Sequence, residues 1–495
     1  MKLTKIKFDP EYQVGPVDPR IFGGFLEHMG RAVYQGVFDP TTAHVDGDGC
    51  RLDVLSALKR LDMTIMRYPG GNFASGYHWQ DGIGPVDKRP VIRELAWQSI
   101  EPNTFGTDEY IQLCRKMRWL PMLTANLGTG TAEEARNWLE YCNSLTGSRY
   151  ADLRARNGSP LPHAVKLWCL GNEMDGPWQL GHVPAEEYAI RAQQAAKMMK
   201  DVDPTIEVVV CGSSNPGMST YIEWDRQVLE YVGDMASYIS LHRYVGNPED
   251  DTLDYLAITN SIDRQIEEID TVCKYVQAKQ RSPRRTFLCF DEWNVWYKNM
   301  EMNGDGQRAP HLIEEIYNLE DALVVAGFMH SFIRHADVVK IANLAQIVNV
   351  IAPIQTRGDE MLVQSIFYPF EMISRRKQGI SLRPFVEGPK YEGRTNGEVT
   401  YIDCSAILNG SVLHAFITNR SSIGSAQVAI DLSGRQLTAL ENAEILTGPD
   451  PKMANSYEYP DRVKSQPFQQ VEVKNGKARM DLPPLSFIAL TFKLG

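Results

Sequence analysis

The sequence lacks a long apolar run, an excess of positive charge and a typical export signal. None of its stretches approaches the ~18–20 apolar residues that a membrane span needs. Its 495 residues carry a formal net charge of -11, which argues against electrostatic binding to nucleic acid or to an anionic membrane. The start, MKLTKIKFDPEYQVG, has lysines but no apolar core of ~7–15 residues behind them. We therefore expect a cytoplasmic protein that binds neither nucleic acid nor membrane.

Motifs for metals, dinucleotides and disulfides are also absent. The eight cysteines form no C-x-x-C pair, and Cys169, Cys211 and Cys289 lie inside apolar runs, as buried thiols in a reducing compartment do. There is no H-x-H or H-E-x-x-H pattern, and no glycine-rich dinucleotide loop follows the first predicted strand. The sequence thus predicts neither a metal site nor a cofactor.

Eight short apolar runs, rich in β-branched residues, recur along the first three quarters of the chain. They are near-continuous rather than alternating, which is typical of parallel strands buried on both faces. The runs are RIFGGFLEH (20–28), MTIMRYPG (63–70), LPMLTANLG (120–128), VKLWCLGNE (165–173), IEVVVCGSS (206–214), YISLHRYV (238–245), TFLCFDEW (286–293) and VVKIANLAQ (338–346).

Helix-like segments separate these runs. Residues 183–204 are one example: Pro184 and two glutamates open the segment, lysines come late, and Pro204 follows its end. Residues 108–119 and 261–281 are two more. Eight strand–helix alternations predict a (β/α)8 TIM barrel, and a doubly wound open sheet is the alternative.

The pattern changes near residue 376, where apolar and polar residues begin to alternate. Asn475-Gly476 is a strong two-residue hairpin signal. We predict an antiparallel β-sandwich that the amino-terminal stretch KLTKIKF joins. The expected domains are a catalytic barrel over 16–375 and a sandwich made of 1–15 plus 376–495.

Polar residues stand where the predicted strands end. In a (β/α)8 barrel the carboxyl ends of all strands face one pocket. Amide, carboxylate and arginine groups suit an uncharged ligand rich in hydroxyls, such as a sugar. The residues are Glu27, His28, Arg67, Asn72, Asn126, Asn172, Glu173, Ser213, His242, Tyr244, Glu292 and Gln346.

Two of these residues, Glu173 and Glu292, supply the pair of carboxyl groups that glycosidic cleavage requires. A single glutamate at a strand end more often orders a loop, but two on the fourth and seventh strands favour catalysis. Arg67 either pairs with a structural carboxylate or orients and ionises the nucleophile. Asp291 should point to the other side of its strand, because side chains alternate.

Aromatic side chains next to the predicted pocket could stack on sugar rings. Five tryptophans lie in or beside loops at its mouth: Trp79, Trp97, Trp178, Trp293 and Trp296. His242 and Tyr244 could instead be hydrogen-bonded core residues.

The sequence resembles the family 51 α-L-arabinofuranosidases of the glycoside hydrolases along its whole length. The resemblance is densest in GGFLEHMGRAVYQGVFDP, RYPGGNFASGYHWQDGIGPVDKRP, WCLGNEMDGPWQ, SLHRY, FDEWNVWY and LAQIVNVIAPI. It implies a barrel joined to a jelly-roll sandwich, a retaining reaction without a cofactor, and hexamers acting on oligosaccharides from arabinoxylan and arabinan.

The resemblance also implies roles for individual residues. Glu173 would be the general acid/base and Glu292 the nucleophile. The remaining residues would bind the substrate or complete the pocket: Glu27, Arg67, Asn72, Asn172, His242, Tyr244, Gln346, Trp97 and Trp296. Arg243, His78 and Gln80 stand where the family pattern has Gln, Asn and Glu. Arg243 is expected to face away from the pocket, and changes in the 74–90 loop to affect the leaving group.

Two other interpretations stay open. One is a related retaining barrel enzyme with a different glycan preference, such as an endo-β-1,4-glucanase or a β-xylosidase. The other is a barrel that binds carbohydrate without cleaving it. Hydrolysis of aryl glycosides of different sugars separates the first from an arabinofuranosidase, and sugar binding without turnover would identify the second.

Overall fold

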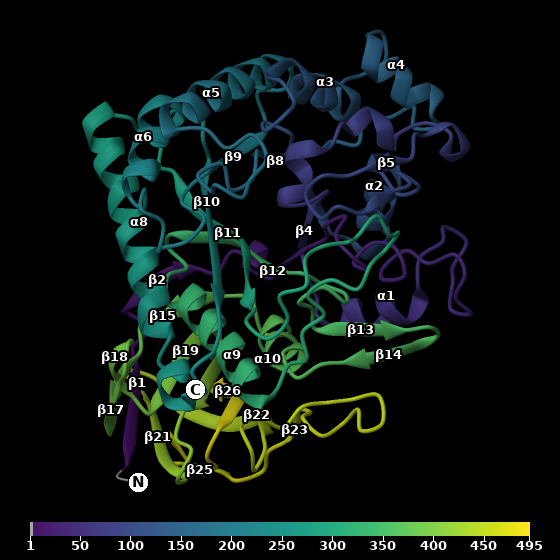
Figure 1. Cartoon of the computed structure of the whole chain (residues 1–495). Coiled ribbons are helices and arrows are strands. Elements are labelled where there is room, and N and C mark those ends of the chain that lie inside the picture. The colour runs from purple at the N-terminus through teal and green to yellow at the C-terminus, as the bar shows by residue number, and fades with distance from the viewer. Residues whose placement is uncertain (1–2) are drawn as a thin grey trace.

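A closed barrel of eight parallel strands forms the larger part of the molecule (Figure 1). The computed structural model describes residues 3–495. Each barrel strand pairs with the next one along the chain, so the predicted barrel is confirmed and an open doubly wound sheet is excluded. The strands are β3 (Gly23–Phe25), β4 (Ile65–Tyr68), β7 (Leu120–Ala125), β8 (Leu167–Leu170), β9 (Glu207–Cys211), β10 (Tyr238–Val245), β11 (Phe287–Val295) and β12 (Val339–Ala345).

Helices follow the barrel strands and cover the outside of the barrel. As predicted, α5 begins just after Pro184, carries acidic residues in its first turn and ends before Pro204. Within residues 3–495, no helix has both the length and the apolar character of a membrane span. The helices are α1 (Leu52–Arg60), α2 (Thr107–Met117), α3 (Ala132–Asn143), α4 (Arg149–Arg156), α5 (Ala185–Val202), α6 (Glu223–Val232), α7 (Thr252–Leu256), α8 (Thr259–Gln280), α9 (Leu319–Arg334) and α10 (Phe367–Ser374).

The inside of the barrel is packed with side chains, so the barrel is a core rather than a pore. Apolar residues that point inward from several strands form one buried cluster. Its members include Ile65, Met122, Leu167, Val209 and Ile341. All eight cysteines are free and buried, in agreement with the sequence.

Two sheets packed face to face make up the second part of the molecule. Their strands are β1 (Thr4–Phe8), β2 (Gln13–Pro16), β15 (Ile380–Leu382), β16 (Phe385–Glu387), β19 (Ile402–Asn409), β20 (Val412–Asn419), β21 (Ala426–Leu432), β22 (Leu437–Thr447), β23 (Gln466–Pro467), β24 (Val471–Lys474), β25 (Lys477–Leu482) and β26 (Ser486–Leu494). The five-stranded sheet has the order β16-β1-β21-β25-β24, and the seven-stranded sheet β2-β15-β19-β20-β26-β22-β23.

The amino-terminal strand lies inside this sandwich, as predicted. β1 pairs with β16 on one side and with β21 on the other, and Figure 1 shows it in purple among the green strands of the carboxyl-terminal part. Asn475 and Gly476 both have positive φ and join β24 to β25, which confirms the predicted hairpin. Short two-stranded ribbons occupy loops elsewhere: β5 (Ile92–Arg93) with β6 (Ile100–Glu101), β13 (Ile354–Arg357) with β14 (Glu360–Val363), and β17 (Lys390–Gly393) with β18 (Gly397–Thr400).

The sandwich is joined to the barrel through α9. One face of the seven-stranded sheet packs into the same hydrophobic core as this helix, through side chains such as Phe416 and Phe487. Buried polar contacts cross the same boundary, where His330 of α9 lies 2.9 Å from the hydroxyls of both Ser405 and Thr418. The barrel and the sandwich therefore share a continuous interior.

Candidate active site

A cavity of about 1010 Å³ opens at the carboxyl ends of the barrel strands. Its wall combines acidic, amide and aromatic side chains, which suits an uncharged polar ligand. Eight of the predicted site residues line it: Glu27, Asn72, Trp97, Glu173, Tyr244, Glu292, Trp296 and Gln346. The other three, Arg67, Asn172 and His242, lie behind this wall and contact the residues that form it.

Glu292, in the carboxyl-terminal half of β11, is held on both of its carboxylate oxygens. Arg67 of β4 donates from Nη1 to Oε1 across 2.6 Å, and Tyr244 donates its hydroxyl to Oε2 across 2.9 Å. Arg67 is completely buried and also donates to Oδ1 of Asn172 at 2.7 Å. Two fixed donors therefore set both the position and the orientation of this carboxylate.

Glu173 faces Glu292 across the cavity. His242 Nδ1 lies 2.9 Å from Oε1 of Glu173 and 3.4 Å from Oε2 of Glu292. The indole of Trp178 donates to Oε2 of Glu173 at 2.6 Å. One oxygen of each glutamate and one nitrogen of His242 all lie within 4.8 Å of one another. The two acids, 119 positions apart in the sequence, are thus close neighbours.

Asp291 corrects the prediction made from strand alternation. It does not turn away from the site: Oδ2 lies 3.2 Å from Nε of the same Arg67 that holds Glu292, and Oδ1 accepts from Ser240 at 2.5 Å. The strand register shifts between Phe290 and Trp293, so β11 bulges here and two consecutive carboxylates share one arginine. The alternation rule fails because it assumes an unbroken strand.

Opposing electrostatic effects act on these buried groups. Burial alone would lower the pKa of His242, but the carboxylates of Glu292 and Asp291 raise it well above its ordinary value. For Asp291, burial would raise the pKa, yet Arg67 and His242 hold it at about 2. Burial raises the pKa of Glu292, and His242 and Arg67 counteract that rise. The site therefore holds two buried cations beside its carboxyl groups.

Glu27, just beyond β3, is the third carboxyl group of the cavity. Its Oε1 accepts from the backbone N–H of Phe73 at 3.0 Å and from the indole of Trp97 at 3.1 Å. Burial, together with the nearby Glu292, raises the pKa of Glu27 to about 8. A protonated Glu27 can donate a hydrogen bond to a hydroxyl group at neutral pH.

Side-chain amides form and support the floor of the cavity. Asn172 donates to Oδ1 of Asn72 at 3.2 Å, so these two residues lie side by side. Gln346, at the end of β12, accepts from the backbone N–H of Glu27 at 3.0 Å. The indole of Trp296 packs edge-on against Tyr244, with ring centroids 5.6 Å apart. Each of these residues was predicted to lie at the site.

Some residues that the sequence placed at the pocket lie elsewhere. Trp79 stacks on Trp138, and Trp293 packs against Phe328, so both are core residues rather than part of the pocket mouth. Three other strand-end residues form hydrogen bonds to a neighbouring strand, loop or helix instead: His28 to Tyr68 of β4, Asn126 to the backbone of 128–130, and Ser213 to Asp225 of α6.

Two contributors to the site were missed. Trp178 was noted only as one aromatic residue among several, although it lies in the same motif as Glu173 and donates to it. Arg243 was expected to face away, yet it lines the cavity, while its guanidinium donates to Ser261 of α8. His78 and Gln80 line a separate surface depression that the 131–137 segment borders.

On distance alone, the cluster of Glu173, His242 and Glu292 could also hold a metal ion. Imidazole and carboxylate are ordinary ligands for zinc, whose bonds to them are about 2.0–2.2 Å long. In this structure, however, Arg67 and Tyr244 already bond to the oxygens of Glu292. The same short distances equally suit proton transfer and nucleophilic attack at one centre.

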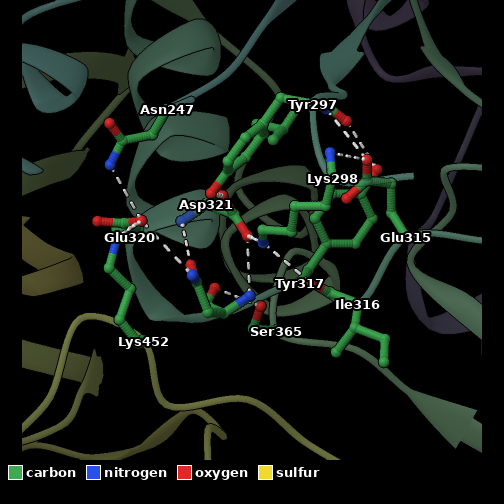
Figure 2. A network of polar contacts seen from close by, with 12 residues as sticks. Asn247, Tyr297, Lys298, Glu315, Ile316, Tyr317, Glu320, Asp321, Ser365 and Lys452 are labelled. Carbon is green, nitrogen blue, oxygen red and sulfur yellow. Dashed lines mark hydrogen bonds and ion pairs between the residues drawn. The ribbon is translucent and has the colours of Figure 1, made fainter. Parts of the chain in front are cut away.

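The outer wall of the cavity belongs to the loop between β11 and α9. This loop is anchored by the network of polar contacts in Figure 2. Oε1 of the fully buried Glu315 accepts from the backbone N–H groups of Tyr297, Lys298 and Asn299 at 3.0, 2.6 and 3.0 Å. Lys298 in turn pairs with Asp321 at the start of α9. The loop segment next to the cavity is therefore fixed by buried carboxylates.

The same network reaches the second part of the molecule. Glu320, fully buried in the first turn of α9, accepts from Lys452 at 2.6 Å and from Asn247 at 3.3 Å (Figure 2). Lys452 lies between β22 and β23 of the sandwich, whereas Asn247 follows barrel strand β10. The sandwich thus contributes to the support around the cavity without lining it.

Comparisons with known proteins agree with this architecture. Residues 57–257 match the family described as the α-L-arabinofuranosidase 1 domain, and residues 291–486 match the α-L-arabinofuranosidase C-terminal domain. An intracellular exo-α-(1→5)-L-arabinofuranosidase of Acetivibrio thermocellus is 44% identical over 92% of this chain and 93% of its own. An exo-α-(1→6)-L-arabinofuranosidase of Bifidobacterium longum is 40% identical over 99% of this chain and 97% of its own.

Solved structures lead to the same result. A family 51 α-L-arabinofuranosidase from Bifidobacterium longum superimposes with a TM-score of 0.95 at 35% identity, over 99% of both chains. The fold and the relatives together show the class of the protein: this chain is a glycoside hydrolase built on a (β/α)8 barrel. Within that class it belongs to family 51, the α-L-arabinofuranosidases, as its sequence motifs predict.

Proposed function

We propose that the protein removes terminal L-arabinofuranose by a retaining double displacement. An oxygen of Glu292 attacks C1 of the sugar while the bond from C1 to the leaving oxygen breaks, and Glu173 gives that oxygen a proton. Water then attacks C1 and breaks the ester, and Glu173 takes the proton from the water. Retaining enzymes hold their two carboxyl groups ~5–5.5 Å apart, inverting enzymes ~6.5–9.5 Å apart. Facing oxygens within 4.8 Å support the retaining reaction.

The different surroundings of the two acids support their assignment. Arg67 and Tyr244 fix both oxygens of Glu292, as an oriented nucleophile needs. Glu173 contacts His242 and the half-exposed Trp178, so it lies nearer the mouth, where a leaving group departs. We assign Glu27, Asn72, Asn172 and Gln346 to the sugar hydroxyls, and Trp97 and Trp296 to the cavity wall.

The test separates the roles of the two glutamates. Glu173→Ala should still form the ester from an aryl arabinofuranoside whose leaving group needs no proton, and added azide should restore turnover. Glu292→Ala should be inactive on every substrate when no external nucleophile such as azide is added. Product anomers followed by NMR should show retention. Equal loss of activity in both variants, or an inverted product, would contradict the proposal.

For the substrate, we propose oligosaccharides derived from arabinan and arabinoxylan. The names of the relatives support arabinose-containing chains, but they specify different linkages, α-(1→5) and α-(1→6). A panel of arabino- and arabinoxylo-oligosaccharides with defined linkages would identify the preferred one. Aryl β-xylosides and β-glucosides belong in the same panel, because faster cleavage of either would favour another glycosidase.

Three further expectations from the sequence enter here as proposals. The name of the Acetivibrio thermocellus relative supports an intracellular location. We also propose a homo-oligomer, with the hexamer as the expected state; light scattering on the purified protein measures it directly. Finally, we place the division between the domains at residues 15/16 and 375/376. Circular dichroism of a fragment spanning 16–375 would show whether the barrel folds without the sandwich.

A further inference from the structure

Arg243, on β10, is a cavity-lining arginine without an acidic partner. Across residues 3–495 it forms no ion pair, and its one hydrogen bond goes from Nη2 to the hydroxyl of Ser261 at 2.6 Å. Its Nε is buried and has no hydrogen-bond partner in the described part of the chain. Arg154, a buried arginine that has no acidic partner among the described residues either, instead donates to three backbone carbonyls, of Tyr141, Ser159 and Pro160. Arg243 thus has donor capacity that the protein does not use.

The surroundings of Arg243 favour a negative charge. A guanidinium stays protonated in proteins, and burying it without a counter-ion costs free energy. Burial lowers the pKa of Arg243, and the charge interaction with Tyr221 counteracts this. Ser261 lies in the first turn of the 22-residue helix α8, which carries no acidic side chain there. The positive end of this helix therefore adds to the positive potential around Arg243.

Arg243 stands on the side of the cavity where the leaving group departs. The cavity that Arg243 lines also contains Glu173, the residue to which we assign protonation of the leaving oxygen, and Trp178, which donates to Glu173. The 214–217 segment and Ile258 line the cavity together with Arg243. The sugar that is cleaved would instead lie deeper, against Glu27 and Asn172. A group that reaches Arg243 therefore belongs to the leaving part of the substrate.

We propose that Arg243 binds a carboxylate on the leaving group, so that the enzyme favours arabinofuranose attached to a glycan that carries a uronic acid. The proposal rests on the hydrolytic function proposed above. The planar guanidinium has several donors that match the two oxygens of a carboxylate. Elsewhere the cavity wall carries glutamates, among them Glu301 at the mouth. Arg243 therefore attracts a uronate, whereas the glutamates of the wall repel it. This difference sets the orientation in which the substrate binds.

Matched substrates test this. One is an arabinofuranosyl oligosaccharide with a uronic acid in its leaving part, and the other is the same compound after reduction of the carboxyl group to an alcohol. The wild-type enzyme should show a higher kcat/KM for the acid form, and raising the salt concentration should reduce that preference. Arg243→Gln should lower the acid-to-neutral ratio by at least about tenfold, because hydrogen bonds to charged groups contribute that much.

Two variants serve as comparisons. Arg243→Lys keeps the positive charge and should retain part of the preference for the acid form over the neutral form. Arg226→Gln removes one positive charge from α6, where Arg226 pairs with Glu223 and Glu230, and should leave the ratio unchanged. An acid-to-neutral ratio near one in the wild type would overturn the proposal, and so would an equal ratio in wild type and Arg243→Gln.

Binding separates this proposal from the hydrolytic one. Calorimetry with the Glu292→Gln variant measures the affinity for each form of the oligosaccharide without turnover. Tighter binding of the acid form, lost when Arg243→Gln is added, supports the uronate site even if no arabinose is released. Equal binding of both forms overturns it. By contrast, failure of the wild type to cleave the neutral form would count against the proposed function alone.

Discussion

Arg67 on β4 donates a hydrogen bond from Nη1 to Oε1 of Glu292 on β11, and 225 positions of sequence separate the two residues. The same arginine also contacts Asp291 and Asn172, so one buried cation fixes three neighbours. Removing one partner of a buried ion pair typically costs about 3–5 kcal/mol. Arg67 is therefore the residue on which the geometry of the proposed nucleophile depends most.

We predict that Arg67→Lys lowers kcat/KM by about 100-fold and moves the acidic limb of its pH profile to higher pH. A lysine ammonium cannot bond to Glu292, Asp291 and Asn172 together. With weaker stabilisation of its anion, the pKa of Glu292 rises, and the ionised nucleophile is lost at a higher pH. Arg154→Lys is the control, because Arg154 is equally buried but lies outside the site. An unchanged acidic limb in Arg67→Lys would contradict this account.

Glu27 leads to a prediction about binding. Its pKa is raised to about 8, so the side chain is protonated at neutral pH and becomes an anion above that value. An ionised Glu27 repels Glu292 and no longer donates to a sugar hydroxyl. The affinity for L-arabinose, measured by calorimetry from pH 6 to 9, should therefore fall above about pH 8.

The variant Glu27→Gln provides the comparison for this prediction. Glutamine is neutral throughout the range, so the decline in affinity should disappear even if binding is weaker at every pH. Affinity for arabinose is the right measurement, because turnover by the proposed mechanism also depends on proton transfer by Glu173. If the decline persists in Glu27→Gln, another group causes it.

Glu315 should position the outer wall of the cavity without touching substrate. Its carboxylate accepts from three consecutive backbone N–H groups of the loop that carries Trp296, Met300 and Met302. Glu315→Ala removes these bonds and leaves buried donors unpaired, at a cost of about 1–3 kcal/mol each. We predict a rise of about tenfold in KM for oligosaccharides and faster proteolysis within 297–318.

The control for the loop is Glu267→Ala. Glu267 lies exposed on α8, where its contact with His335 is 3.7 Å long, so both measurements should stay at wild-type values. If Glu315→Ala matches the wild type in KM and in proteolysis, the loop does not depend on this carboxylate. A change in proteolysis without a change in KM would mean that the loop wall does not contact the substrate.

The barrel could be predicted because its strands are buried on both faces. Each strand is then a near-continuous apolar run, and polar residues near its carboxyl end face the cavity, as Glu173 just beyond β8 and Glu292 late in β11 do. The positions of Glu173 and Glu292 relative to their strands were thus enough to predict that the two acids lie close together. The Asn475-Gly476 turn was equally predictable, because both residues adopt positive φ at low cost.

Features that depend on irregular backbone or on partners distant in sequence could not be predicted. The bulge that turns Asp291 toward Arg67 has no signal in the residues around it. Trp79 and Trp293 sit beside loops in the sequence, but their rings pack inward onto partners contributed by helices. Alternation along β10 likewise did not predict that Arg243 lines the cavity, because alternation does not determine the course of a long side chain.

The last prediction concerns the boundary between barrel and sandwich. Asp403 of β19 accepts from Arg334 of α9 at 2.7 Å and also pairs with Arg420. Although burial opposes it, these arginines hold the pKa of Asp403 well below its usual 3.8. The carboxylate is therefore ionised at neutral pH, and its stabilising effect is lost only as the pH falls below about 4.

Asp403→Asn should thus lower the free energy of unfolding by about 3–5 kcal/mol at pH 7, because it leaves two buried guanidinium groups short of a counter-ion. Thermal melts followed by circular dichroism should show a clearly lower melting temperature for the variant than for the wild type at pH 7. This difference in melting temperature should become smaller at acidic pH. Asp431→Asn is the matched control in the same domain. Asp431 pairs with Lys477 at an exposed site, where a salt bridge contributes at most about 1 kcal/mol. Equal melting temperatures for the two variants would mean that the Asp403 cluster does not hold barrel and sandwich together.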